Sequence, residues 1–259
     1  IADDLKLNKP MLRLVQGDVG AGKTLVAGVA ACHALEEGWQ VALMAPTEIL
    51  AEQHYLNFKK WFEPLGLSVS WLSGKQKGKA RAAAEQIIKD GSAHLIVGTH
   101  ALFQENVEFA KLGLVIIDEQ HRFGVDQRLA LRNKGLDGMT PHQLVMTATP
   151  IPRTLAMSAY GDLDTSVIDE LPPGRTPIQT VTIPLDRREE VLNRIATNCA
   201  EDKQAYWVCT LVEQSETLDA QAAEATYQEI RERFPHLKVG LVHGKMKADE
   251  KQSVMQQFK

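Results

Sequence analysis

The feature that most constrains this chain is a glycine-rich stretch near its start. Residues 17–24 read GDVGAGKT and fit the pattern G-x-x-x-x-G-K-[ST]. The apolar residues 12–15 before the stretch are typical of a buried strand, and the small apolar residues 25–31 after it are typical of a helix. A chance glycine-rich turn does not explain this strand–loop–helix order, so the stretch predicts a phosphate-binding loop.

The loop has the chemistry to bind a nucleoside triphosphate. Glycines let the backbone curl so that successive N–H groups point at phosphate oxygens, and the start of the following helix adds further N–H groups. We expect Lys23 to reach the β- and γ-phosphates and the Thr24 hydroxyl to ligate Mg²⁺. The predicted nucleotide-binding residues are Gly17, Asp18, Val19, Gly20, Ala21, Gly22, Lys23 and Thr24.

Short apolar runs alternate with longer segments of helical period from residue 12 to about residue 149. This alternation predicts an α/β domain of three layers, with helices on both faces of a mostly parallel sheet. Ligands of such sheets lie outside the carboxyl ends of the strands, so polar residues just after a strand are candidate site residues. The predicted strands are 12–15, 41–45, 68–72, 94–97, 114–117 and 143–146, and the predicted helices begin near residues 23, 48, 79 and 124.

Two adjacent carboxylates, Asp118 and Glu119, follow the apolar strand 114–117. In a P-loop ATPase the acid at the strand end holds Mg²⁺ through water, and the next acid can polarise the attacking water. We therefore predict Lys23, Asp118 and Glu119 as catalytic residues. The alternative is an acidic helix start favoured by the helix dipole; the phosphate loop upstream disfavours it.

Three further strand ends carry small polar residues: Pro46–Glu48, Gly98–His100 and Thr147–Thr149. Thr47 suits the N-cap of a helix, and the second and third groups suit turns. Thr147 and Thr149 are also placed to hydrogen-bond the acid pair or a water molecule bound to phosphate. Spacing alone favours local structure over function for all three groups.

A turn-rich stretch, LPPGRTP at residues 171–177, interrupts the α/β pattern. The pattern then restarts with predicted strands at 178–183, 205–209 and 238–242 and predicted helices at 187–199 and 214–234. We divide the chain into a first domain (1–166), a linker (167–177) and the N-terminal part of a second α/β domain (178–259). The chain begins without Met and ends within a helical pattern, so we expect a piece of a longer protein.

Composition adds few constraints. The net charge of −4 gives no bulk evidence for nucleic-acid binding, although a basic groove can lie on an acidic protein. Cys32, Cys199 and Cys209 lack metal-like spacing, which favours a reducing compartment. No apolar run approaches the roughly 18 residues that span a bilayer. We expect a cytoplasmic protein without a membrane partner.

The motifs GDVGAGKT, PTEILAEQH, VGTHAL, VIIDEQHRFG and TATPIPRT occur in this order. Together they resemble the first motor domain of a superfamily 2 helicase, which is RecA-like. DEQHRFGV and TATPIPRTLA are shared with the transcription-repair coupling factor translocase. The stretches YGDLD (160–164) and LPPGR (171–175) make the chain more similar to bacterial RecG-type ATP-dependent DNA helicases, and this resemblance covers essentially the whole chain.

The resemblance implies roles for the motif residues. ATP and Mg²⁺ would be bound by the phosphate loop, with Thr24 and Asp118 on the metal, partly through water. The basic stretch 75–81 suits an electrostatic contact with DNA and a solvated helix start equally. Residues implied to couple the ATP state to DNA are Gln120, His121, Thr147, Thr149 and Arg153. Residues implied to contact the DNA backbone are Pro46, Thr47, Glu48, Gly98, Thr99 and His100.

The resemblance also implies a monomeric motor of the bacterial cytosol that remodels branched DNA, such as replication forks and Holliday junctions, in recombination and repair. The family's arginine motif would lie beyond Lys259, and its wedge domain and adenine-contacting glutamine motif before Ile1. We therefore expect the chain alone to hydrolyse ATP poorly or not at all. The alternatives are a double-stranded DNA translocase of the coupling-factor type, a small-molecule P-loop kinase, which leaves DEQH and TATP unexplained, and a non-catalytic ATP-binding module.

Overall fold

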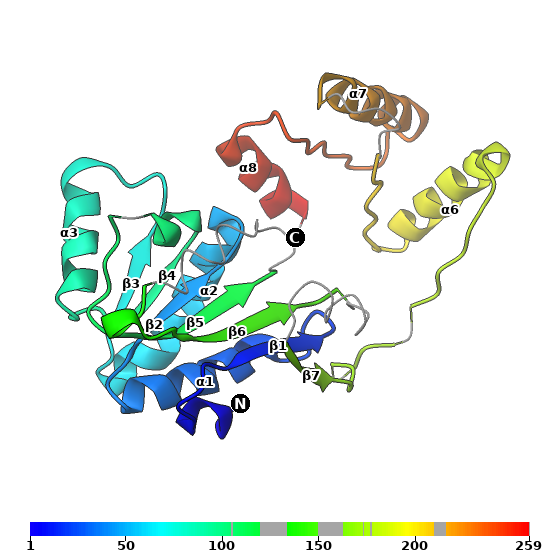
Figure 1. Ribbon diagram of the computed structural model, residues 1–259. Helices are drawn as coiled ribbons and strands as arrows, with labels where there is room; N and C mark the ends of the chain where they lie inside the picture. Colours follow the sequence, from blue (N-terminus) through cyan, green and yellow to red (C-terminus); the bar gives the residue numbers. More distant parts are fainter. Residues whose placement is uncertain are drawn as a thin grey trace. The chain divides into compact units, whose positions relative to one another are not determined.

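The computed structural model describes residues 1–104, 106–119, 134–149, 163–172, 174–176, 178–209 and 216–258. The chain divides into two compact units, Ile1–Thr176 and Pro177–Lys259 (Figure 1). The first unit contains a β-sheet with helices on both faces, and the second contains helices joined by extended segments.

The first unit is built on a seven-stranded sheet in which every pair of neighbouring strands is parallel. Its order is β3-β4-β2-β5-β6-β1-β7. Six strands overlap the predicted ones, which confirms the predicted fold class, and β7 was not predicted. The strands are β1 (Leu12–Gly17), β2 (Gln40–Met44), β3 (Val69–Leu72), β4 (Leu95–Gly98), β5 (Leu112–Asp118), β6 (His142–Thr147) and β7 (Asp164–Ile168).

Helices cover both faces of this sheet and make it the middle layer of three (Figure 1). On one face α1 (Lys23–Glu36) and α2 (Glu48–Phe62) pack against side chains such as Leu43 and Ile116. On the other face α3 (Gly78–Lys89) and the 3₁₀ turn η3 (His100–Phe103) pack against neighbours such as Val115. Because both faces are covered, residues 114–117 of β5 are all buried, as their unbroken apolar run predicts.

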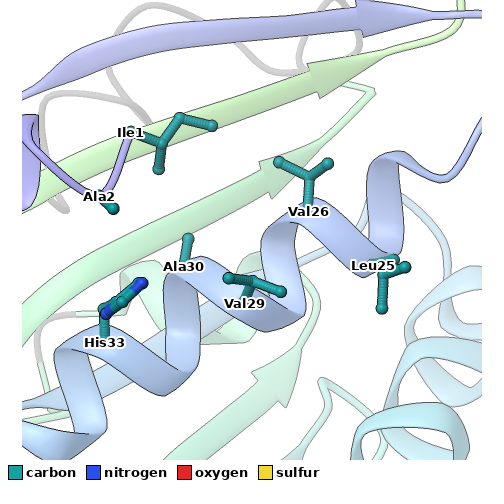
Figure 2. Close-up of a pocket in the computed structure, with 7 residues that line it drawn as sticks. All are labelled: Ile1, Ala2, Leu25, Val26, Val29, Ala30 and His33. Carbon is teal, nitrogen blue, oxygen red and sulfur yellow. The ribbon is translucent and has the colours of Figure 1, made fainter.

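Three more 3₁₀ turns complete the described part of the first unit: η1 (Asp4–Lys6), η2 (Glu63–Leu65) and η5 (Leu136–Gly138). The outer side of α1 borders an open apolar hollow of about 270 Å³ (Figure 2). The hollow is lined by Ile1, Ala2, Leu25, Val26, Val29, Ala30 and His33.

None of the described helices is long and apolar enough to cross a membrane.

The second unit contains η6 (Leu185–Arg187), α6 (Arg188–Ala200), α7 (Glu216–Arg233) and α8 (Ala248–Phe258). Arg188 joins α6 to α7 because its guanidinium donates two hydrogen bonds, of 2.5 and 2.7 Å, to the Glu229 carboxylate. The same guanidinium lies 5.1 Å from the ring centroid of Trp207, within the range of a cation–π contact. Polar contacts therefore connect the two helices.

The three strands predicted in this unit, at 178–183, 205–209 and 238–242, are wrong for the structure as described. These segments form no ladder with any described strand, and Ile178 and Val208 are 79% and 76% exposed. A strand is stabilised by hydrogen bonds and side-chain contacts with a neighbouring strand, and these segments have no such neighbour in the described ranges. Alternating apolar residues therefore did not suffice to make strands here.

Candidate functional site

The described motif residues gather along one edge of the sheet, because parallel strands all end on the same side (Figure 1). The order of the strands divides this edge into two halves. The predicted catalytic, nucleotide-binding and coupling residues follow β5, β6 and β1, and the predicted DNA contacts follow β4 and β2. The two halves meet where β2 pairs with β5, in the register Met44 to Ile117.

The phosphate loop joins the end of β1 at Gly17 to the start of α1 at Lys23. Gly20 and Gly22 have φ angles of +83° and +96°, a left-handed conformation that glycine adopts without strain. The Lys23 ammonium donates to the backbone carbonyls of Gly17 (2.8 Å) and Asp18 (2.9 Å). The backbone of the loop thus holds the lysine side chain over the loop. The N–H groups at the start of α1 face the same region.

The predicted catalytic acids, Asp118 and Glu119, lie at the end of β5. Glu119 has a φ angle of +50°, which is uncommon for a residue with a side chain, and its N–H donates to the Met146 carbonyl (2.9 Å). Its carboxylate accepts hydrogen bonds from the Thr147 hydroxyl (3.2 Å) and the Ala148 N–H (3.3 Å). The Thr149 N–H in turn donates to the Thr147 hydroxyl (3.1 Å). The end of β6 therefore fixes the second acid, and the predicted bond from Thr147 to the acid pair is present.

The first acid, Asp118, contacts His54, a residue for which the sequence predicted no role. Its Oδ2 lies 2.7 Å from Nε2 of His54, which belongs to α2. The two side chains are only 14% and 9% exposed. The available signal was the spacing within PTEILAEQH: His54 lies seven residues after Thr47, which is two helical turns along α2.

The segment after β7 lies on the phosphate loop. The Arg175 guanidinium donates to the Asp18 carboxylate (2.6 Å) and thereby holds the pKa of this acid below its usual range. The Arg175 N–H closes a turn on the Pro172 carbonyl (3.1 Å). A Cβ placed on Gly20 would lie 3.4 Å from Pro172, so the turn and the loop are in contact. The turn residues of this segment predicted a linker, and the contact with the phosphate loop was not predicted.

The predicted DNA contacts after β2 form a capped helix start. The Thr47 hydroxyl accepts a hydrogen bond from the Leu50 N–H (3.3 Å), which confirms the predicted N-cap. The Glu48 carboxylate forms an ion pair of 2.5 Å with Lys75 from the loop after β3. The N–H of Ala45, just before Pro46, donates to the Gly98 carbonyl (3.1 Å) and so joins the two predicted DNA-contact turns.

The turn after β4 is tightly built. A Cβ on Gly98 would lie 2.1 Å from the Leu72 carbonyl oxygen, so only glycine fits where β4 and β3 end together. Thr99 is buried, and its hydroxyl has no partner within the described part of the chain. His100 is exposed and begins η3. A glycine required by packing thus places an exposed histidine on the rim.

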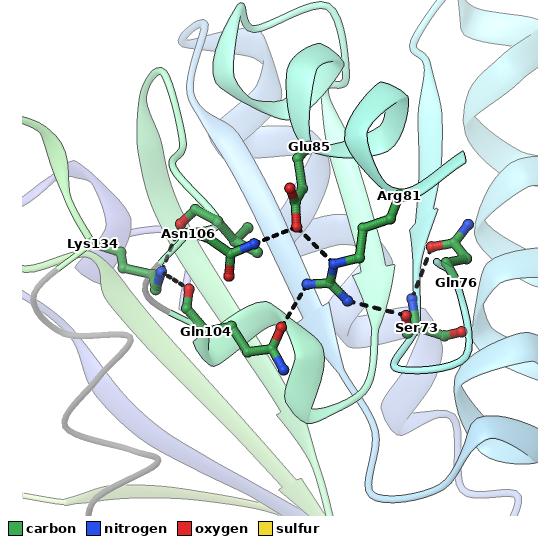
Figure 3. Close-up of polar contacts among 8 residues, drawn as sticks. Ser73, Gln76, Arg81, Glu85, Gln104, Asn106 and Lys134 are labelled. Atoms are coloured by element: carbon green, nitrogen blue, oxygen red, sulfur yellow. Dashed lines mark hydrogen bonds and ion pairs between the residues drawn. The ribbon is translucent and has the colours of Figure 1, made fainter. Parts of the chain in front are cut away.

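Figure 3 shows the contacts that hold Arg81, the last residue of the basic stretch 75–81. The Arg81 guanidinium donates to the side chains of Glu85 and Gln104, both at 2.7 Å, and to the Ser73 carbonyl at 3.4 Å. This arginine therefore ties α3 to Gln104, the residue that follows η3, and is not available as a free charge. Lys77 and Lys79 are exposed. An electrostatic contact of this stretch with DNA would therefore depend on these lysines and not on Arg81.

Three predicted coupling residues, Gln120, His121 and Arg153, lie outside the described residues, as does the helix predicted from residue 124. Among the residues that are described, no three His, Cys, Asp or Glu side chains gather closely enough to hold a metal ion by themselves.

Residues 5–158 match the family model described as DEAD/DEAH box helicase. The chain belongs to the DEAD/DEAH box helicase family. The region that matches the family model contains the phosphate loop, the acid pair and both predicted DNA-contact turns. It also contains Thr147 and Thr149.

Over its whole length the chain is 65% identical to the ATP-dependent DNA helicase RecG of Escherichia coli strain K12 and 63% identical to that of Haemophilus influenzae. It spans 38% of the length of each of these relatives. A solved structure of RecG bound to a three-way DNA junction superposes with a TM-score of 0.75 at 40% identity, covering 99% of this chain and 33% of that one. The predicted resemblance to RecG-type helicases is confirmed.

Proposed function

We propose that this chain is the ATP-binding motor part of an ATP-dependent DNA helicase that remodels branched DNA. The observation that carries the proposal is the adjacency of the phosphate loop and the acid pair at one sheet edge, in a chain 65% identical to RecG. β1 pairs with β6 and β6 pairs with β5, so loop, threonines and acids follow three neighbouring strands.

ATP phosphates are proposed to bind the N–H groups of residues 17–24, with Lys23 exchanging its two backbone carbonyl partners for phosphate oxygens. Mg²⁺ fits the residues present, because this ion is usually held by one or two carboxylates together with substrate phosphates. Thr24 and Asp118 would hold it, partly through water, and it would neutralise charge that develops on the phosphates.

Glu119 is proposed to orient the attacking water and to accept its proton. Two hydrogen bonds from the end of β6 hold its carboxylate, so its position depends on Thr147 and Ala148. A movement of the β6 end would therefore move the general base. This link supports the proposed coupling role of Thr147 and Thr149, and we extend that role to Gln120, His121 and Arg153 by family resemblance.

The other half of the edge is proposed to hold one DNA strand through its phosphates. The start of α2 offers backbone N–H groups near Pro46, Thr47 and Glu48, and the turn after Gly98 offers the exposed His100, which follows the buried Thr99. The exposed Lys77 and Lys79 add positive charge beside this rim. Contacts of this kind do not read base sequence and weaken with salt. The RecG structure with a three-way junction supports branched DNA as the partner.

We further propose that residues 178–259 form the first part of a second RecA-like domain. The exposed Ile178, Val181, Tyr206, Val208 and Val242 lie on the segments predicted as strands, and such residues suit strands that pair with neighbours from a longer chain. The longer protein would act as a monomeric motor in the bacterial cytosol.

The decisive experiment is Lys23→Ala in the full-length protein, with ATP turnover measured with and without a three-way DNA junction. Loss of ATP turnover is expected while binding of the DNA junction stays, because the lysine is proposed to contact the phosphates of ATP and not the DNA. Lys9→Ala, at an exposed position outside the loop, is the matched control. A Lys23→Ala protein with the normal DNA-stimulated rate would contradict the proposal, and so would a native protein that DNA does not stimulate.

A further inference from the structure

Helix α2 connects the two halves of the sheet edge. Its first turn, capped by Thr47, belongs to the proposed DNA rim after β2. Two turns later its His54 contacts Asp118 at the end of β5, in the proposed ATP half. Among the described contacts of the motif residues, this one joins a helix of the DNA half directly to a catalytic side chain of the other half.

The contact has the properties of a positioning bond. Nε2 of His54 and Oδ2 of Asp118 are 2.7 Å apart, and both side chains are largely buried. An ionised carboxylate only accepts hydrogen bonds, so Nε2 carries the proton and donates it. The Phe58 ring lies edge-on to the imidazole, with 6.4 Å between the centroids, and helps to fix its plane. The bond therefore restricts rotation of the Asp118 carboxylate.

We infer that His54 is a positioning residue that orients Asp118 for Mg²⁺–nucleotide and makes this orientation depend on the position of α2. The inference rests on the proposed function. Hydrogen-bond partners of a metal-binding carboxylate fix its direction, and their loss typically costs about 10- to 100-fold in metal affinity or activity. His54 is a positioning residue and not a catalytic one, because it touches Asp118 and no reacting atom.

The geometry of α2 gives the coupling its physical basis. Thr47 and His54 are separated by about 10 Å along one continuous helix, at about 1.5 Å per residue. A helix transmits a small displacement as a rigid element. DNA that shifts the start of α2 would therefore shift His54 and, through one hydrogen bond, the carboxylate of Asp118.

The test compares His54→Gln with His54→Asn in the full-length protein. The Gln amide nitrogen can reach the place of Nε2 and keep the bond, whereas the shorter Asn amide reaches only the place of Nδ1. The first readout is the Mg²⁺ concentration that half-saturates binding of a fluorescent ATP analogue. The second is the ratio of ATP turnover with and without a three-way DNA junction.

We expect the Asn variant to need about 10- to 100-fold more Mg²⁺ than the native protein, and to lose much of its DNA stimulation. The Gln variant should remain close to native in both readouts, and analogue binding without Mg²⁺ should be the same in all three proteins. His33→Asn, on the outer side of α1 and 42% exposed, is the control for a lost histidine.

Equal Mg²⁺ requirements of the Asn and Gln variants would overturn the inference, even if one of them melts at a lower temperature, because that result describes a purely structural histidine. Failure of the proposed function gives a different pattern. The native protein would then show no DNA-stimulated turnover, while the Mg²⁺ dependence of analogue binding would still test His54.

Discussion

The two units of this chain carry similar sequence patterns and have different structures. The first unit has seven paired strands and a core of buried aliphatic and aromatic side chains. In the second unit the apolar segments are extended and exposed, and Leu192 is its one buried hydrophobic residue among the described side chains. The comparison teaches that a strand pattern becomes a strand only where a neighbouring strand pairs with it and helices cover it.

Hydrogen exchange should show the largest difference between the units. The amides of β2 and β5 are expected to exchange at least about 1,000-fold more slowly than those of residues 178–183 and 205–209, because core strands open only with global unfolding. Mass spectrometry or NMR of the intact chain measures both sets together. Equal protection of the two sets would break the comparison and show that the second unit has its own paired strands.

A matched pair of isoleucines should show a smaller difference. Ile116→Ala in β5 removes a fully buried side chain and should lower the free energy of unfolding by about 2–5 kcal/mol. Ile178→Ala removes a side chain that is 79% exposed and should change it by no more than about 0.5 kcal/mol. Urea unfolding monitored by circular dichroism measures both. A comparable loss from Ile178→Ala would show that this segment is packed.

The smallest expected effect is a pH dependence confined to the first unit. Burial holds the pKa of His142, at the start of β6, below its ordinary value of 6.5, and its Nδ1 accepts a hydrogen bond from the Met11 N–H (2.9 Å). The unfolded chain therefore binds this proton at a higher pH than the folded chain does, so stability is full above pH 6.5 and falls as the pH drops below it.

Urea midpoints taken from about pH 7.5 to about pH 5.5 should show this loss. Its size should be no more than about 1 kcal/mol, the usual net contribution of one hydrogen bond. His142→Asn keeps an acceptor near Nδ1 and should flatten the dependence. A midpoint that rises on acidification, or an Asn variant with the native slope, would contradict the assignment.

The fold of the first unit was largely predictable because its information is local. Apolar runs such as 114–117, flanked by helical segments, correctly predicted strands that are buried on both faces. Thr47 correctly predicted the start of a helix. β7 was missed because residues 164–168, DTSVI, are short and half polar. The predictions of strands at 178–183 and 205–209 failed because strand pairing depends on partners elsewhere in the chain. The residues of a single segment do not indicate such partners.

The site followed the same rule. The phosphate loop and the acid pair were found because each is a compact motif after a strand. The contacts of His54 with Asp118 and of Arg175 with Asp18 were not found, since their partners are 64 and 157 residues apart in sequence. Side chains so far apart are brought together only by strand order, which the sequence did not reveal.

That strand order also bears on how the chain is made. β1 comes before the other described strands of the first unit in sequence, yet its two neighbours are β6 and β7, which come last among those described strands. Gly17 pairs with Ile168, so β1 can complete its pairing only after the chain has been synthesised as far as residue 168. Contacts this distant in sequence slow folding and expose unpaired edges. The phosphate loop, which directly follows β1, thus acquires its place in the sheet only after the last described strands of the unit have been synthesised.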